Sequence, residues 1–288
     1  MKIAIIGAQG QLGSDLFQQL PDAIGWGHFE MEITDAECVN SRLDSAGPDV
    51  VVNCAAYNLV DQAEDEPEVA FRVNALGPRL LAKWCAENSA MLVHVSTDYV
   101  FGQDADRKTP YREADLAGPV GAYGISKLAG EQFVQAVCPR HLIVRTCGLY
   151  GHNATRAKGN FVSTMLRLAK ERDELRVVND QHCTPSYTRH VATGIIQLIR
   201  GNQSGLYHLT NSGPATWYDV ASEAVRIMGL KAKVTPIPSS EYPTKARRPA
   251  YSVLDCGKYE QVTGTRMPDW RDALAEFLWE SGGSRDER

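Results

Sequence analysis

Short, mainly apolar runs recur along the chain, and each leads into small or polar residues. Runs of this kind are typical of strands that are covered on both faces. We therefore predict strands over residues 2–6, 49–53, 91–95 and 141–145, and later ones over 175–179 and 205–209.

Between these runs the apolar positions follow helical spacing. In the segment 67–88, Ala70, Val73, Leu80 and Trp84 fall on one stripe of a helix. The same spacing predicts helices over 12–20, 122–137, 161–171, 186–200, 217–228 and 270–280. Residues 236–249 hold four prolines and are predicted to be a loop.

The alternation of strands and helices predicts the α/β class, with a Rossmann-like, doubly wound parallel sheet. It becomes irregular beyond residue 146. We expect residues 1–146, completed by about 172–200, to form the parallel-sheet domain. Residues 147–171 and 201–288 are then expected to form a smaller α/β domain.

Small and hydroxyl-bearing residues follow four of the predicted strands: Gly7, Cys54-Ala55-Ala56, Ser96-Thr97 and Thr146-Cys147. In a doubly wound sheet the carboxyl ends of the strands open onto one crevice. The sequence therefore predicts a ligand site at this edge of the sheet.

A glycine loop, Gly7-Ala8-Gln9-Gly10-Gln11-Leu12-Gly13, follows the first strand and opens a helix. Gly7 permits a tight turn, Gly10 lets the backbone approach a pyrophosphate, and Gly13 allows close packing of helix on strand. A glycine loop can also serve only as a turn. Its position between strand and helix favours binding of a dinucleotide.

Tyr123 and Lys127 are four residues apart in a predicted helix and so lie on one helix face. A nearby ammonium lowers the pKa of a phenol, and a phenol of lowered pKa can donate a proton to a carbonyl. Thr97, at the end of a strand, can place a hydroxyl beside them, although it is also an ordinary strand-end residue. These residues indicate a site for hydride transfer.

The composition is that of an ordinary globular enzyme, with 43% hydrophobic and 23% charged residues and a net charge of −5. This balance argues against a nucleic-acid or anionic-membrane partner. No apolar run approaches the roughly 18 residues of a membrane span, and the first residues lead directly into a strand. Seven scattered cysteines suggest reduced thiols. We expect a cytoplasmic protein.

The ordered motifs together resemble the extended short-chain dehydrogenase/reductase family, and more narrowly its dTDP-4-dehydrorhamnose reductases. Besides the glycine loop and Tyr123-x-x-x-Lys127, the matching stretches are Ser-Thr-Asp-Tyr-Val-Phe (96–101), Val-Asn-Cys-Ala-Ala-Tyr (52–57), Leu-Ala-Gly-Glu (128–131), Val-Asn-Asp-Gln (178–181) and Ala-Arg-Arg-Pro (246–249). These stretches extend over almost the whole chain. The resemblance implies an NAD(P)-binding domain, a smaller substrate-binding domain and reduction of the 4-keto group of a dTDP-linked sugar.

Carried over by position, the resemblance makes Thr97, Tyr123 and Lys127 the catalytic set. The cofactor would be bound by Tyr123, Lys127, the loop residues Gly7, Gln9, Gly10, Gln11, Leu12 and Gly13, and by Glu32, Ile33, Ala55, Ala56 and Tyr57. Asn74 would either stabilise the adjoining backbone or be a polar residue inside a helix.

For the nucleotide-sugar substrate the implied residues are Thr97, Asp98, Gly148 and Arg248. Arg248 would bind the diphosphate through its forked guanidinium, whereas Arg247-Arg248 could also be a solvated pair. Asp98 could equally form a local turn. Residues 179–181 could contact the sugar or turn the chain.

At three places the chain departs from the family pattern. Tyr57-Asn58-Leu59 stands where Thr or His-Thr is usual. Gly148 stands where the family commonly has a Trp that packs on the sugar. This difference leaves open which sugar is bound and how. Some relatives bridge a homodimer through magnesium held by glutamates. Asp15 could replace one of these, but Arg189 falls near another, so no metal is predicted and a homodimer remains an option.

Cofactor choice depends on the region after the second strand. Residues 28–33 contain Glu30 and Glu32 and no Arg or Lys, a pattern that favours NAD. The resemblance implies NADPH with NADH possible, and NADPH is named first on that ground.

Two rivals differ in class. A related epimerase or dehydratase commonly has a further acid/base pair after the Thr, whereas Thr97 is followed by Asp98-Tyr99. A non-catalytic regulatory subunit, like that of methionine adenosyltransferase, resembles the same family. The intact Thr97, Tyr123 and Lys127 set favours a reductase.

Overall fold

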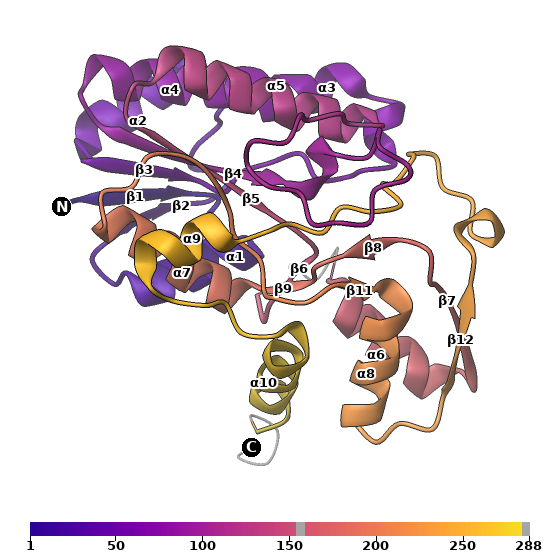
Figure 1. The fold of residues 1–288 in the computed structure, drawn as a ribbon. Helices are drawn as coiled ribbons and strands as arrows, with labels where there is room; N and C mark the ends of the chain where they lie inside the picture. Colours follow the sequence, from indigo (N-terminus) through magenta and orange to yellow (C-terminus); the bar gives the residue numbers. More distant parts are fainter. Residues whose placement is uncertain (154–158, 284–288) are drawn as a thin grey trace.

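The computed structural model describes residues 1–153 and 159–283, and its centre is a six-stranded parallel sheet (Figure 1). The strand order is β2-β1-β3-β4-β5-β10. The bounds are β1 (Ile3–Ile6), β2 (Ile24–Trp26), β3 (Val50–Asn53), β4 (Met91–Thr97), β5 (His141–Thr146) and β10 (Gly205–His208). The predicted α/β class and doubly wound parallel sheet are confirmed.

The strand order reverses at β1, which lies between β2 and β3. Crossover connections on the two sides of such a point run in opposite directions, and this leaves a crevice at the carboxyl ends of the strands. The glycine loop follows β1, and residues 54–56 follow β3. The topology therefore brings the two segments to the same crevice.

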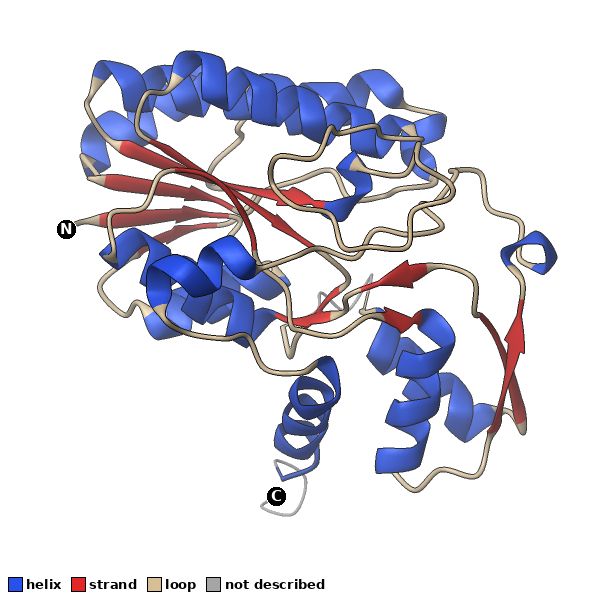
Figure 2. Ribbon diagram, viewed as in Figure 1, coloured by secondary structure: helices blue, strands red, loops and turns tan. Residues whose placement is uncertain are grey.

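Helices cover both faces of this sheet, as Figure 2 shows. One face is covered by α2 (Ala36–Ala46), α4 (Gly77–Glu87) and α5 (Ala122–Val137), and the other by α1 (Gln11–Gln19), α7 (Thr188–Arg200) and α9 (Gly257–Thr263). Within β1, the side chains of Ala4 and Ile6 pack against the face covered by α2, α4 and α5. Those of Ile3 and Ile5 pack against the face covered by α1, α7 and α9. This alternation explains why the strand is apolar throughout.

The predicted helix over 67–88 is three successive segments: α3 (Pro67–Phe71), a π-helical turn η2 (Arg72–Leu76) and α4. A π turn inserts an extra residue into the helical ladder and is found mostly at functional sites. The turn contains Asn74, which points into the protein and is buried.

The smaller part of the molecule lies beneath the carboxyl edge of the sheet, at the lower right of Figure 1. It has three two-stranded pairs and three helices. The pairs are β6 (Leu149–Tyr150) with β9 (Ser186–Tyr187), β7 (Glu174–Val178) with β12 (Lys233–Ile237), and β8 (His182–Cys183) with β11 (Ala215–Thr216). The helices are α6 (Phe161–Glu171), α8 (Trp217–Ile227) and α10 (Trp270–Gly283).

The strand pairings correct the expected division of the chain in two places. β10 joins the large sheet beside β5, although residues 201–288 were assigned to the smaller domain. β7 pairs with β12, although residues 172–200 were expected to complete the large domain. A strand's sequence shows that it is buried and leaves its partner open, and for this reason the division by sequence order is wrong here.

Several elements are absent from the sequence-based assignment: β2, α2, α9, β12 and the two-residue strands β6, β8, β9 and β11. β9 falls in the predicted helix over 186–200, and the end of β12 falls in the predicted loop over 236–249. β2 has only three residues, and α2 has only a short apolar stripe, Val39, Leu43 and Ala46, in an otherwise polar sequence. Its local signals are the Asp35 carboxylate, which accepts hydrogen bonds from the backbone of Glu37 (2.9 Å) and Cys38 (3.3 Å), and left-handed Gly47 after its end. These two caps would have located the helix.

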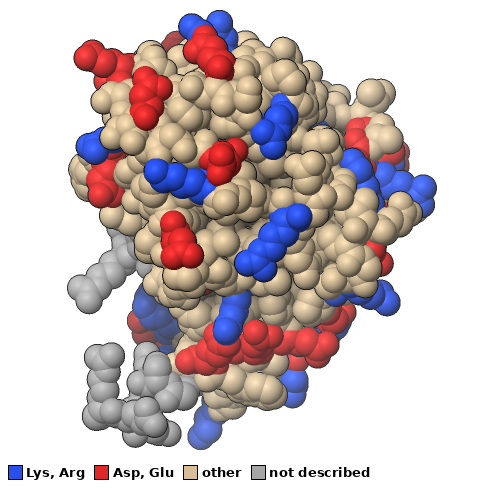
Figure 3. All heavy atoms as spheres, turned by 90° about the vertical axis from the view of Figure 1, so that its left-hand side faces the viewer, with Lys and Arg blue, Asp and Glu red and all other residues tan. Residues whose placement is uncertain are grey.

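Three short 3-10 helices complete the described secondary structure: η1 (Gln62–Glu64), η3 (Asp98–Val100) and η4 (Ser239–Glu241). Basic and acidic side chains are interspersed on the face shown in Figure 3. Within residues 1–153 and 159–283, no helix is long and apolar enough to cross a membrane.

Candidate active site

The glycine loop packs closely enough that its glycines are required. Gly7 has a φ of +78°, and a Cβ there would lie 2.9 Å from the Ala55 nitrogen. A Cβ on Gly13 would lie 2.1 Å from the Gly7 carbonyl oxygen, which real contacts do not allow. The loop therefore brings the start of α1, with its exposed N–H groups, against the end of β3.

A pocket opens between this loop, the segment after β2 and the segment after β3. Nine of the predicted cofactor residues line it: Gly7, Gln9, Gly10, Gln11, Glu32, Ile33, Ala55, Ala56 and Tyr57. The lining that the prediction missed is Ile6, Gly27, His28, Met31, Cys54, Asn58, Leu59, Val73 and Gly159. Of the other predicted residues, Leu12 is buried in the core and Gly13 packs on Gly7.

The end of the pocket beyond β2 is acidic. Glu32 is held in place because its Oε1 accepts hydrogen bonds from the backbone (2.9 Å) and hydroxyl (2.8 Å) of Thr34. The described lining includes no Lys or Arg. A carboxylate in this position can accept a hydrogen bond from a ribose hydroxyl.

The wall beyond β3 is held by Asn74 of the π turn. Its Oδ1 accepts from the Tyr57 backbone N–H (2.9 Å), and its Nδ2 donates to the Tyr57 carbonyl (2.9 Å) and the Ser126 hydroxyl (3.0 Å). Of the two interpretations given above for Asn74, the structure shows stabilisation of the adjoining backbone. Through Ser126 the same side chain ties this wall to α5.

Thr97, Tyr123 and Lys127 come together where β4 ends and α5 begins. Thr97 and Tyr123 are hydrogen-bonded through their side chains, and the Lys127 ammonium donates to the Val95 carbonyl of β4 (2.7 Å). A Cβ on Gly124 would lie 2.2 Å from the Tyr99 carbonyl oxygen, so glycine is required for α5 to approach η3. Glu64 accepts a hydrogen bond from the Ala122 N–H (2.8 Å) and caps the helix.

The expected lowering of the Tyr123 pKa by Lys127 is wrong. Burial raises the pKa of Tyr123 to about 12, although its hydrogen bond with Thr97 lowers it in part. Lys127 is buried too, and burial lowers its pKa to about 8. Its ammonium is turned to the Val95 carbonyl and not to the phenol of Tyr123.

A buried ion pair lies beneath Lys127. Glu131, one turn further along α5, accepts two hydrogen bonds from Arg145 of β5, at 2.9 and 2.7 Å, and one from Ser96 at 2.5 Å. Both side chains of the pair are almost fully buried. The negative charge of Glu131 partly offsets the cost of burying the Lys127 ammonium.

Asp98 lies beside Thr97 but faces into the protein, with 2% of its surface exposed. Its Oδ1 accepts from the Thr97 hydroxyl (3.1 Å), and its Oδ2 accepts from the Ser252 hydroxyl (2.6 Å) and the Cys147 thiol (3.0 Å). The predicted contact with substrate remains a prediction, and this geometry does not favour it. Ser252 and Cys147 carry no signal in the sequence that marks them as neighbours of Asp98.

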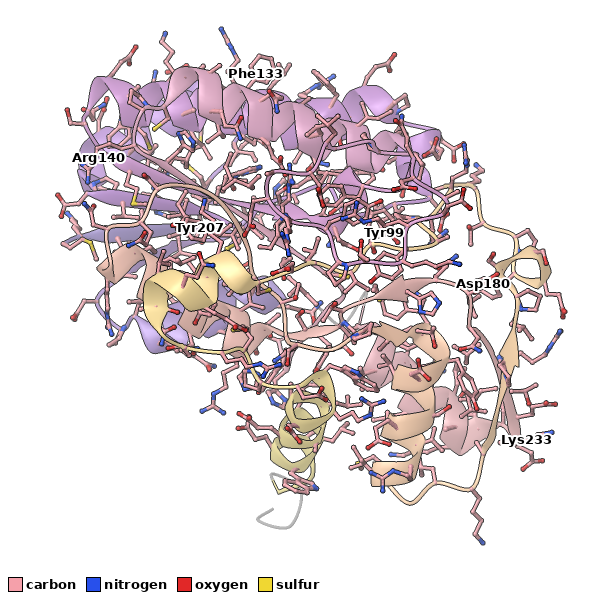
Figure 4. All side chains as sticks on the ribbon, viewed as in Figure 1. Tyr99, Phe133, Arg140, Asp180, Tyr207 and Lys233 are labelled. Carbon is pink, nitrogen blue, oxygen red and sulfur yellow. The ribbon has the colours of Figure 1, made fainter. Side chains whose placement is uncertain are left out.

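Arg248 is held across the crevice by Asp61, 187 residues earlier in the chain. Its two terminal nitrogens donate to the two carboxylate oxygens at 3.1 and 2.8 Å. The guanidinium also hydrogen-bonds Tyr99, which Figure 4 labels between the large sheet and the smaller part. Arg247 is exposed. The described side chains thus place Arg248, and not Arg247, against the crevice.

Gly148 follows β5 with a φ of +53°, a left-handed conformation that favours glycine. A Cβ there would lie 3.2 Å from the Pro185 Cα and 3.4 Å from the ring of Trp217. An aromatic ring from α8 therefore occupies the space beside residue 148. Asp180, labelled in Figure 4, accepts hydrogen bonds from the backbone N–H of Ser239, 59 residues later in the chain (3.0 and 2.9 Å).

Asp15 and Arg189 stand at the positions compared above with the magnesium ligands of some relatives. Arg189 pairs with Glu280 of α10, and Asp15 is buried near Thr188. The residues that the structure describes contain no group of three His, Cys, Asp or Glu side chains that could hold a metal.

Comparison with known proteins matches residues 1–282 to the family model described as "RmlD substrate binding domain". The chain is 42% identical to a dTDP-4-dehydrorhamnose reductase of Mycolicibacterium smegmatis over 96% of this chain and 85% of that one. It is 39% identical to the spore coat polysaccharide biosynthesis protein SpsK of Bacillus subtilis over 99% of each. A dTDP-4-dehydrorhamnose reductase of Bacillus anthracis, solved in complex with NADP, superposes with a TM-score of 0.91 at 37% identity, covering 97% of this chain and 99% of that one.

The glycine-loop pocket and the Thr97, Tyr123 and Lys127 set lie within the matched residues, and the match extends over nearly the whole chain. The protein belongs to the family described by the RmlD substrate binding domain.

Proposed function

We propose that this protein reduces the 4-keto group of dTDP-4-dehydro-β-L-rhamnose to give dTDP-L-rhamnose, with hydride supplied by NADPH or NADH. The single observation that supports this most directly is the hydrogen-bonded pair of Thr97 and Tyr123 beside buried Lys127, at the strand edge that also holds the glycine loop. The reductase names of relatives with about 40% identity supply the substrate.

The pocket fits the dinucleotide. The start of α1 presents N–H groups to the pyrophosphate, Glu32 accepts from the adenosine ribose, and residues 55–57 cover the middle of the molecule. When bound, the cofactor supplies the hydride. The bound NADP in the Bacillus anthracis relative supports NADPH, and the absence of Lys and Arg from the described lining supports use of NADH as well.

The residues of this chain then position the ketone and supply the proton. Tyr123 donates its hydroxyl proton to the ketone oxygen, because a phenol is a stronger acid than the alcohol that forms. Lys127 binds the nicotinamide ribose, and Thr97 orients the carbonyl. Arg248 binds the diphosphate through its forked donors, and the smaller part, with Gly148, encloses the sugar.

The proposal also covers location and assembly. A cytoplasmic enzyme is supported by the seven cysteines, all of which are unpaired. Self-association as a homodimer is part of the proposal, and light scattering of the purified protein tests it.

The test mixes purified protein with NADPH and the dTDP-linked 4-keto sugar and follows loss of the reduced cofactor's absorbance. We expect turnover in the wild type and none in Tyr123→Phe, which keeps its affinity for NADPH. Tyr242→Phe, at an exposed tyrosine, is the matched control. Full turnover in Tyr123→Phe would contradict the mechanism, and no turnover in the wild type would contradict the function.

A further inference from the structure

The Thr97 hydroxyl lies between two acids, the phenol of Tyr123 and the carboxyl of Asp98. It already accepts a hydrogen bond from the Tyr99 backbone N–H (3.2 Å), and it has one proton of its own to donate. In the structure that proton goes to Asp98 (3.1 Å). Toward Tyr123 the hydroxyl can then only accept, so the phenol proton points to Thr97.

This arrangement must reverse when Tyr123 acts as an acid. Once the phenol has lost its proton, its oxygen needs a donor, and Thr97 is the neighbour that can supply one. Thr97 can give its proton to Tyr123 only if another acid replaces that proton, and Asp98 is the carboxyl group in hydrogen-bond contact with the Thr97 hydroxyl. The hydrogen bonds therefore run in one of two directions, and the protonation of Asp98 selects between them.

We propose that Asp98 returns a proton to Tyr123 through the Thr97 hydroxyl after each reduction. Asp98 acts through Thr97 and is a positioning residue that also holds the proton. The inference rests on the reduction proposed above.

The steps balance as follows. The ketone carbon gains a hydride, and its oxygen takes the Tyr123 proton, which gives the alcohol and a phenolate. The phenolate takes the Thr97 proton while Thr97 takes the proton of the Asp98 carboxylic acid. The products are neutral Tyr123, an unchanged Thr97 and an Asp98 carboxylate, which solvent protonates when the product leaves.

The surroundings of Asp98 suit both of its states. Burial raises the pKa of Asp98, so the acid form is favoured relative to an exposed aspartate. The charge of the ionised carboxylate raises the pKa of Tyr123, so a phenolate and a carboxylate on the two sides of Thr97 disfavour each other. After the transfer, the hydroxyl of Ser252 (2.6 Å) and the thiol of Cys147 (3.0 Å) hold the carboxylate.

The other ionisable groups around Asp98 do not supply this proton as readily. They are the phenol of Tyr99 on η3 and the thiols of Cys147, after β5, and Cys183, on β8; burial raises the pKa of Tyr99 and of Cys147. Arg248 adds a positive charge on the far side of Tyr99.

The kinetic test uses Asp98→Asn in rapid mixing with NADPH and the keto sugar. Tyr123 starts with its own proton, so the first reduction proceeds at close to the wild-type rate. Later turnovers need the returned proton and slow by about 100-fold. We expect a burst, that is, a fast phase in which each active site oxidises one NADPH, followed by slow steady-state turnover. First and later turnovers slowed equally, or not slowed, would overturn the proposal.

Asp15→Asn is the matched control, because Asp15 is also a buried carboxyl whose pKa burial raises, and it lies away from Thr97. In Asp15→Asn, the ratio of the first-turnover rate to the steady-state rate should equal that of the wild type. A burst in Asp15→Asn as well would show that loss of any buried carboxyl produces it, and would overturn the proposal.

A second variant, Ser252→Ala, serves if Asp98→Asn does not fold. Loss of that donor raises the pKa of Asp98 further, so the fall of kcat at high pH moves to higher pH. An unshifted profile contradicts the proposal.

A readout without substrate separates this inference from the proposed function. The infrared difference spectrum of ligand-free wild type minus Asp98→Asn should show a carboxylic acid band at neutral pH. If Asp98 is ionised there, the proposal fails, whatever the enzyme reduces. If the band is present but the wild type does not oxidise NADPH with the keto sugar, the proposed function is what fails.

Discussion

Arg248 is held at the crevice by Asp61. The hydrogen bond with Arg248 lowers the pKa of Asp61, which shows that the carboxylate and the guanidinium are strongly paired. In this two-bond pair with Asp61, the side chain of Arg248 is still about one-fifth exposed, so its guanidinium can also bind an anion of the ligand. A lysine at this position keeps the charge but cannot form the two parallel hydrogen bonds.

We expect Arg248→Lys to raise KM for the nucleotide sugar about 10-fold, because one charge-assisted hydrogen bond is lost. kcat should change much less, since Arg248 does not touch the ketone. Initial-rate measurements over a range of sugar concentrations check this. Arg247→Lys, at the exposed neighbour, should leave both constants unchanged. An equal effect of the two substitutions would argue against a diphosphate role for Arg248.

His208 gives a prediction about acid stability. It is fully buried in β10, and burial lowers its pKa to about 3. As pH falls below about 6.5 the unfolded chain takes up a proton that the folded protein does not, so stability is lost. From about pH 7 to about pH 5 this group removes about 2 kcal/mol.

His208→Asn keeps a donor for the Tyr111 carbonyl and should lose less stability over that range. Urea unfolding at the two pH values measures the difference. His28→Asn, at an exposed histidine, should behave as the wild type. If His208→Asn loses as much stability on acidification as the wild type, His208 is not the source.

At the scale of elements, α5 is placed by close approaches on both of its sides. Gly124 allows contact with η3, and a Cβ on Gly130 would lie 2.1 Å from the Asn74 carbonyl oxygen of the π turn. The helix that carries Tyr123 and Lys127 is thus clamped between the end of β4 and the turn that holds the cofactor pocket. Two small residues in the helix make this possible.

Gly130→Ala should therefore destabilise the protein by about 2 kcal/mol or more. In an open helix the same change stabilises by roughly 0.5–1 kcal/mol. Gln132→Ala, at an exposed position of α5, is the control and should be close to neutral. Denaturant unfolding compares the variants. A stabilising effect of Gly130→Ala would show that the helix can move away from the turn at little cost.

The element-level predictions succeeded where periodicity is strong. The bounds of α5 agree with the predicted 122–137, and the helix over 161–171 is α6. The π turn within 67–88 was not predicted, because the apolar spacing of this segment was interpreted as one continuous α-helix. β2, β6, β8, β9 and β11 were missed because they have only two or three residues, and α2 because its apolar stripe is short. β12 and α9 were missed as well.

At the scale of the whole molecule, segments distant in sequence build the pocket. Its lining comes from the end of β1 and the loop after it, the segments after β2 and β3, Val73 of the π turn and Gly159 beyond β6. A ligand that binds only this assembled pocket stabilises the whole fold by mass action. NADPH at about 100 times its Kd should add about 2.7 kcal/mol to the free energy of unfolding.

Thermal unfolding with and without NADPH checks this value. Tyr123→Phe should keep most of the stabilisation, since the substitution leaves the lining of the pocket unchanged. Gln9→Glu places a negative charge in the pocket beside the pyrophosphate and should reduce it. A stabilisation equal to that of the wild type in Gln9→Glu would show that the dinucleotide lies elsewhere.

Local features of the sequence determined the class of fold, most helices and strands, and the residue types of the candidate site. Periodicity and glycine spacing are properties of neighbouring residues, so they can be identified without knowing what packs against them. The glycine loop and the Tyr123–Lys127 spacing are features of this kind.

Only the tertiary structure decided which sheet β10 and β7 join, that Ser252 and Cys147 hold Asp98, and that Asp61 holds Arg248. These contacts join residues 49 to 187 positions apart, and their partners are selected by burial and hydrogen-bonding needs that arise once the chain has packed. The raised pKa of Tyr123 has the same origin, because burial is a property of the fold and not of the motif.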